Sequence, residues 1–154
     1  MAGELTAFGG QTTPDERTMA VLAHVLQLVG WWIAPLIIFV LKRDSRFVAF
    51  NALQALLLQI AYMVVCGGFM VVGFVSFFLT AAHGEHQTGG PPPAMFVLFP
   101  LFWLMFMGLW VVMIVVAIVY GIKAGRGEWA EYPLFGRLAR RLLKIGPTGN
   151  SIPG

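Results

Sequence analysis

Three potential metal ligands lie close together in the middle of the chain: His83, Glu85 and His86. Imidazole and carboxylate groups hold zinc and similar ions in proteins, where three or four fixed ligands form the site. These three residues occupy the Gly- and Pro-rich stretch HGEHQTGGPPP, and no clear further ligand accompanies them. We therefore predict that they do not form a metal site.

The residues of the sequence do not form any of the common catalytic patterns. The sequence contains no Ser–His–Asp arrangement that would activate a nucleophile, no Walker-type phosphate loop and no pair of carboxylates within an apolar stretch. We therefore expect no enzymatic activity and no cofactor.

Five polar side chains interrupt the long apolar stretches. Polar groups at membrane depth cost free energy unless they are paired, so we expect them to face the interior of a helix bundle. Hydrogen bonding between helices is one interpretation. A polar pathway for a substrate is the other, and it would need an oligomer because three spans enclose little volume. The five residues are His24, Gln27, Asn51, Gln54 and Gln59.

The elements that position these residues must be largely apolar. Of the 154 residues, 58% are hydrophobic and only 11% are charged, against about 25% charged residues in a soluble domain. This composition predicts an all-α integral membrane protein, because a soluble fold of this size needs more polar surface. The net charge is +3, and the cations lie beside the apolar runs. That placement favours the anionic leaflet of a membrane, and no nucleic acid, as the partner.

The first apolar segment covers residues 19–41. The sequence Thr-Pro-Asp-Glu at 13–16 is typical of a capping box, so a helix is predicted to begin there. At 1.5 Å per residue the segment is about 34 Å long, enough to cross a ~30 Å hydrocarbon core. Pro35 cannot donate to the carbonyl four residues back, so we expect a kinked or broken helix between Gly30 and Pro35. The alternative is a re-entrant hairpin, which moves the N-terminus to the other side.

Two longer transmembrane helices are predicted over about 48–82 and 94–122. Both exceed the thickness of a bilayer, so they should tilt or extend beyond it. A short polar loop joins them, which predicts an antiparallel hairpin. Residues 13–145 are then expected to form a single helical membrane domain between flexible tails at 1–12 and 146–154.

The basic residues indicate an orientation for three spans. Of ten Lys and Arg residues, three lie in the turn at 42–46 and six follow the third span, while only Arg17 precedes the first span. Three spans place that turn and the C-terminal segment on one side, which the positive-inside rule assigns to the cytoplasm. We therefore predict a multi-pass protein of the inner (plasma) membrane, with a cytoplasmic C-terminus and the N-terminus outside.

A short amphipathic helix is predicted over 134–145. At about 100° per residue, its cations lie on one half of the helix and its apolar and small residues on the other. This pattern is typical of a helix in the headgroup plane, where each cation contributes about 1 kcal/mol of attraction to an anionic leaflet. Docking of a soluble partner is the alternative. The cations are Arg137, Arg140, Arg141 and Lys144, and the apolar half holds Leu134, Phe135, Leu138, Ala139, Leu142, Leu143 and Ile145.

Small residues repeat at intervals of four near the end of the third span, at Ala117, Gly121 and Gly125. Such a stripe lets another helix approach closely. The neighbour is either another helix of the same chain or a second copy in a dimer.

A family resemblance rests on two segments, 35–56 and 122–134. The first includes Lys-Arg-Asp-Ser-Arg-Phe-Val, and the second includes Ile-Lys-Ala, Gly-Glu and Tyr-Pro-Leu; Arg17-Thr18 and His24 are also similar. Together they resemble small bacterial membrane proteins of unassigned function that are distantly related to the Tic-twenty component of the plastid protein-import machinery. That family often has a basic residue and a histidine where this chain has Ala49 and Asn51. The resemblance implies a helical membrane fold and, through the plastid relatives, protein translocation.

These patterns together predict a non-enzymatic membrane protein. We expect an accessory or scaffold subunit that packs against other membrane subunits or associates with itself. The alternative is an oligomeric translocation or channel component. Exposure of the buried polar residues to a water-filled path would favour that alternative.

Overall fold

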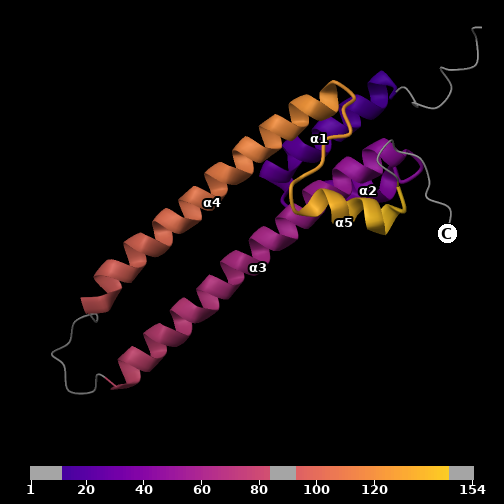
Figure 1. Cartoon of the computed structure of the whole chain (residues 1–154). Helices are drawn as coiled ribbons and strands as arrows, with labels where there is room; N and C mark the ends of the chain where they lie inside the picture. The colour runs from indigo at the N-terminus through magenta and orange to yellow at the C-terminus, as the bar shows by residue number, and fades with distance from the viewer. Residues whose placement is uncertain (1–11, 84–92, 146–154) are drawn as a thin grey trace, which may run out of the picture. The chain divides into compact units, whose positions relative to one another are not determined.

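Residues 12–83 and 93–145 are described by the computed structural model of the protein, and within them the chain forms five α-helices. They divide into two compact units: the first comprises Met1–Ile60 and Ile114–Gly154, and the second comprises Ala61–Met113. The helices are α1 (Pro14–Gly30), α2 (Ile33–Leu41), α3 (Arg46–His83), α4 (Pro93–Gly125) and α5 (Phe135–Leu143) (Figure 1). The expected tails and the stretch from Gly84 to Pro92 lie outside the described residues.

Two helices are long and apolar enough to cross a membrane: Arg46–Thr80 in α3 and Phe96–Gly125 in α4. In their most apolar windows, only 17% and 11% of the residues are buried inside the protein. Side chains such as Val71, Phe78 and Leu104 are more than 60% exposed, which is expected of surfaces that face lipid or another membrane protein. The all-α class is confirmed within the described residues, and two of the three predicted spans are helices that could cross a membrane.

The predicted first span, residues 19–41, is instead two short helices that form a hairpin. Trp31 has a φ of 52°, a conformation that is rare for a bulky residue and that reverses the chain between α1 and α2. Pro35 is the third residue of α2. The first four backbone N–H groups of any helix have no partner within that helix, so the N–H that Pro35 lacks is not needed there. The proline is therefore compatible with the start of α2 and does not kink a continuous helix.

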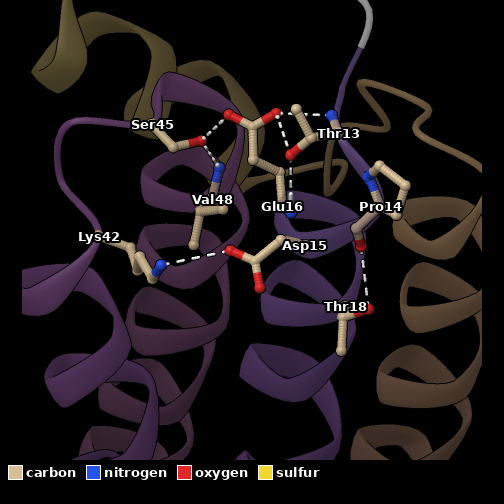
Figure 2. A network of polar contacts seen from close by, with 8 residues as sticks. All are labelled: Thr13, Pro14, Asp15, Glu16, Thr18, Lys42, Ser45 and Val48. Carbon is tan, nitrogen blue, oxygen red and sulfur yellow. Dashed lines mark hydrogen bonds and ion pairs between the residues drawn. The ribbon is translucent and has the colours of Figure 1, made fainter.

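Polar contacts join the start of α1 to the end of α2 (Figure 2). The Ser45 hydroxyl donates to Glu16 Oε1 at 2.6 Å, and Lys42 Nζ lies 3.3 Å from Asp15 Oδ2. The other oxygen of Glu16 accepts from the Thr13 backbone N–H at 2.8 Å, which completes the predicted capping box. The start of α1 and the turn at 42–46 therefore lie at the same end of the hairpin. We call these contacts the clasp.

The clasp predicts a dependence of stability on pH. The Ser45 hydroxyl, and next the Thr13 N–H, hold the pKa of Glu16 below its ordinary value. A depressed pKa stabilises the folded state above the unfolded-state pKa of about 4.3, and this stabilisation is lost as pH falls through the folded-state pKa. The thermal midpoint in detergent should fall between about pH 6 and about pH 3, and Glu16→Gln should flatten part of that fall.

The matched control for this prediction is Glu128→Gln. Glu128 is 4.0 Å from Arg126, and both side chains are well exposed, so this variant should keep the pH dependence of the original chain. Identical pH profiles for the original chain and Glu16→Gln, measured by circular dichroism, would show that the clasp does not stabilise the fold.

Small residues bring α1 close to its neighbours in the first unit. Ala23 packs against Val48 and Ala52 of α3, and Ala20 packs against Phe47 and Ala124. All of these side chains are at most 3% exposed. These small residues allow the helix backbones to approach closely. The polar side chains of His24 and Gln27, also on α1, are buried in the same unit.

Candidate functional site

The polar residues within the first unit form one buried cluster. It draws His24 and Gln27 from α1, the amide residues Asn51, Gln54 and Gln59 from α3, and Tyr132 from the segment between α4 and α5. Each of these six residues is at most 5% exposed. The five polar residues that interrupt the apolar stretches are therefore buried in the interior of the first unit, as expected for polar groups in a helix bundle.

His24 lies at the centre of the cluster, and its partners determine its tautomer. Asn51 Nδ2 donates to the Phe47 carbonyl at 2.9 Å, so Asn51 Oδ1 is left to accept from His24 Nε2 at 3.1 Å. The other ring nitrogen, Nδ1, then accepts from the Tyr132 hydroxyl at 2.8 Å. Burial raises the pKa of Tyr132, which keeps its proton available for donation. The imidazole is therefore neutral.

Two glutamines of α3 satisfy backbone groups elsewhere in the first unit. Gln54 donates to the Ala130 carbonyl at 3.2 Å and accepts from the Tyr132 N–H at 2.6 Å. Gln59 donates to the Gln27 carbonyl near the end of α1, at 2.6 Å. Both side chains hold irregular or terminal backbone against α3, because buried backbone groups need partners.

The closed geometry of the cluster limits what it can do chemically. His24 has both ring nitrogens engaged, by Asn51 and by the Tyr132 hydroxyl, and the glutamines Gln54 and Gln59 bond to backbone groups. No carboxylate, serine or cysteine is hydrogen-bonded to His24 in the described part of the chain. The residues therefore hold helices together, and their near-complete burial gives no support to a water-filled path through the first unit.

Gln27 differs from the other members of the cluster. Its side chain lies near the Tyr132 hydroxyl, which hydrogen bonds to His24, and neither its nitrogen nor its oxygen makes a hydrogen bond of normal geometry among the described residues. An unsatisfied buried amide costs about 1–3 kcal/mol. Gln27→Met fills a similar volume without polar atoms, so it should raise the free energy of unfolding by about 1 kcal/mol.

Gln54→Met is the matched control, because this glutamine is equally buried and makes both of its hydrogen bonds. It should lower the free energy of unfolding by about 1–3 kcal/mol. Denaturant titration of the two variants in the same detergent measures the contrast. Equal destabilisation by both substitutions would contradict the assignment of Gln27 as the unsatisfied member.

The small-residue stripe of α4 faces α1. A Cβ built at Gly121 would lie 3.8 Å from the Cβ of His24, and one built at Gly125 would lie 3.3 Å from Val21 Cγ2. Ala117 is 1% exposed. The structure thus places the stripe against a helix of the same chain, the first of the two arrangements considered for it.

Arg140 is placed differently from the other cations of the terminal helix. Its guanidinium is paired with the carboxylate of Glu131 and lies 4.9 Å from the centre of the Phe50 ring and 5.9 Å from that of Trp129. Its side chain is only 11% exposed. The prediction that Arg140 faces a leaflet was therefore wrong: it anchors α5 to α3, because an acid and two aromatic rings surround it.

The terminal helix is also shorter than predicted. It covers Phe135–Leu143, not 134–145, because Lys144 adopts the left-handed conformation with a φ of 51°. The Lys144 N–H bonds to the carbonyls of Arg140 and Arg141, which closes the last turn. Arg137, Arg141 and Lys144 remain exposed.

No group of three or more His, Cys, Asp or Glu residues that would hold a metal ion occurs in the described ranges 12–83 and 93–145. The prediction that His83, Glu85 and His86 form no metal site stays a prediction, because Glu85 and His86 lie outside those ranges and the side chain of His83 is not described. The cysteine of the chain, Cys66, is buried on α3 and has a free thiol.

Tyr132, Glu131 and Trp129 are the important residues that sequence reasoning missed. Trp129 packs edge-on against Phe47 at 5.2 Å, and Tyr132 packs against Tyr120 at 4.2 Å between ring centres. The signal available in the sequence was the stretch Trp-Ala-Glu-Tyr at 129–132, which brings two amphipathic aromatic residues and one acid into a short connection between two helices. Trp and Tyr in such a stretch usually bury an apolar ring while their polar group finds a partner.

Comparison with known proteins corrects the family expectation. A family model described as the magnetosome magnetite crystal formation protein family, MamF/MmsF, matches residues 15–139. No match to the chain was found among curated proteins or among solved structures. The resemblance to the Tic-twenty group was wrong, because the family model that matches the chain is that of MamF/MmsF. The match covers the clasp apart from Thr13, the buried polar cluster, both candidate spans and the first five residues of α5, and the chain therefore belongs to the MamF/MmsF family.

Proposed function

We propose that this chain is a non-enzymatic membrane protein that takes part in magnetite crystal formation at the magnetosome membrane. The match of residues 15–139 to the family carries this proposal. The buried polar cluster supports the non-enzymatic part, because its hydrogen bonds are used within the fold. The family gives no support to the translocation or channel alternative, and neither do polar side chains that are at most 5% exposed.

The role that fits the surfaces best is that of an accessory or scaffold subunit. The second unit consists of the adjoining parts of α3 and α4, and it exposes large apolar side chains such as Phe74, Phe78 and Trp103 on most of its faces. In a bilayer these faces contact lipid or the apolar helices of other membrane proteins. The first unit holds its buried polar side chains within its own core, so its hydrogen bonds serve its own fold.

Deletion of the coding sequence in its magnetite-forming host tests the proposal. Crystals in the deletion strain should differ in size or shape from those of the parent by electron microscopy, and a plasmid copy of the chain should restore them. The chain should also fractionate with purified magnetosome membranes. Unchanged crystals in a strain that lacks the chain would overturn the proposed function.

A further inference from the structure

The terminal helix α5 presents two different faces in the structure. At about 100° per residue, Gly136, Ala139, Arg140 and Leu143 share one arc, and Ala139 packs with Phe50 and Leu53 of α3. This inner face is fixed to the first unit by the Arg140–Glu131 pair. α5 lies alongside the beginning of α3 (Figure 1).

The outer face of α5 consists of a leucine stripe with cations along one side. Leu134, Leu138 and Leu142 lie within an arc about 80° wide and are 78%, 43% and 59% exposed. The exposed cations Arg137, Arg141 and Lys144 occupy the adjacent arc. Residues 134–145 contain no Asp or Glu, so no acid of the helix neutralises this face.

The position of α5 along α3 indicates which surface meets the outer face. The contacts with Phe50 and Leu53 are four and seven residues beyond Arg46, where the first candidate span begins. At 1.5 Å per residue, α5 is therefore held within about 12 Å of the start of a membrane-spanning helix. A leucine stripe at that level meets acyl chains, and flanking Arg and Lys side chains extend to the headgroups.

We propose that the outer face of α5 is a binding surface for anionic phospholipid in the leaflet on the basic side of the membrane. The leucines enter the acyl region, and Arg137, Arg141 and Lys144 bind the headgroup phosphates. Arg140 has no part in this surface, because it is paired with Glu131. Charge complementarity selects an anionic leaflet over a neutral one. Each exposed cation should raise the equilibrium constant for binding of the outer face to an anionic leaflet about fivefold.

Spin labelling of the full chain in nanodiscs tests the proposal. A nitroxide is attached at Leu138→Cys in a Cys66→Ala background, and its accessibility to oxygen, which partitions into lipid, is compared with that to a water-soluble nickel reagent. With phosphatidylglycerol present, oxygen should relax the label more than nickel does. With phosphatidylcholine alone, the oxygen-to-nickel ratio should be several-fold lower, and salt should lower it only in the anionic nanodiscs.

The matched variants separate this face from the other cations of the protein. Arg137→Gln with Arg141→Gln should reduce the binding equilibrium in anionic nanodiscs by roughly 25-fold. Arg43→Gln with Arg46→Gln removes the same charge from the exposed turn between α2 and the start of α3. This variant should leave the oxygen-to-nickel ratio of the label unchanged. A label that is open to nickel in anionic nanodiscs means that water covers this face, and a label shielded from both reagents means that protein covers it. Either result overturns the proposal, as does an equal ratio in the two lipids.

Discussion

Cysteines at both ends of the chain and in the basic turn should be protected together in intact cells. The variants are Thr6→Cys, Asp44→Cys and Ser151→Cys, each with Cys66→Ala, and an impermeant thiol reagent should label them only after the membrane is permeabilised. Thr88→Cys should be labelled without permeabilisation. The physical reason is the clasp, which holds the start of α1 beside the 42–46 turn (Figure 2), combined with the positive-inside rule.

This expectation differs from the orientation inferred for three spans. With α1 and α2 as a hairpin, Arg17 joins the other nine Lys and Arg residues on one side, so all ten basic residues share it. Labelling of Thr6→Cys and Thr88→Cys together, with Asp44→Cys protected, would mean that residues 19–41 cross the membrane after all. The permeabilised sample controls for the reactivity of each cysteine.

Replacement of His24 should produce the largest loss of stability among single substitutions in the buried cluster. His24→Leu removes the donor to Asn51 Oδ1 and the acceptor of the Tyr132 hydroxyl. Each buried polar group left without a partner costs about 1–3 kcal/mol, so the total loss should be about 2–6 kcal/mol. Denaturant titration in detergent, followed by circular dichroism, measures the effect.

A triple variant tests whether the loss of stability comes from the polar groups that His24→Leu leaves without partners. His24→Leu combined with Asn51→Leu and Tyr132→Phe removes the orphaned polar groups together with the imidazole. The triple variant should be more stable than His24→Leu alone, because replacing every partner by apolar groups is far less costly than leaving some unpaired. If the triple variant shows the sum of the three single losses, the hydrogen bonds are independent and the cluster is not a network.

Hydropathy was sufficient to predict α3 and α4 to within three residues at each end. It was not sufficient for residues 19–41, because an apolar run of that length has the same composition whether it crosses the bilayer or turns back at Trp31. The reversal depends on contacts between residues far apart in sequence, such as the 2.6 Å hydrogen bond between Ser45 and Glu16. Local propensity does not contain that information.

The candidate site was predictable in its composition but not in its pairings. The free-energy cost of an unpaired polar group at membrane depth predicts that His24 and Asn51 lie in the interior, and both are buried in the structure. Tyr132 lies 108 positions after His24, and no periodicity links the two. Arg140 shows the same limit. Its helical angle lies between the inner face of α5 and the arc of Arg137 and Arg141, and its contacts with Glu131, Phe50 and Trp129 show that it belongs to the inner face.

The reversal at Trp31 also has a consequence for biogenesis. On the topology predicted above, the four charged side chains Glu4, Asp15, Glu16 and Arg17 never pass through the hydrocarbon, because the hairpin enters and leaves from the side of synthesis. Transfer of a charged side chain to the middle of a membrane helix costs about 2.5–3.5 kcal/mol on insertion scales. On that topology, residues 84–92 are the segment that crosses the membrane, and they contain one acid and no Lys or Arg. α3 and α4 enter the membrane as one pair of helices around that short segment.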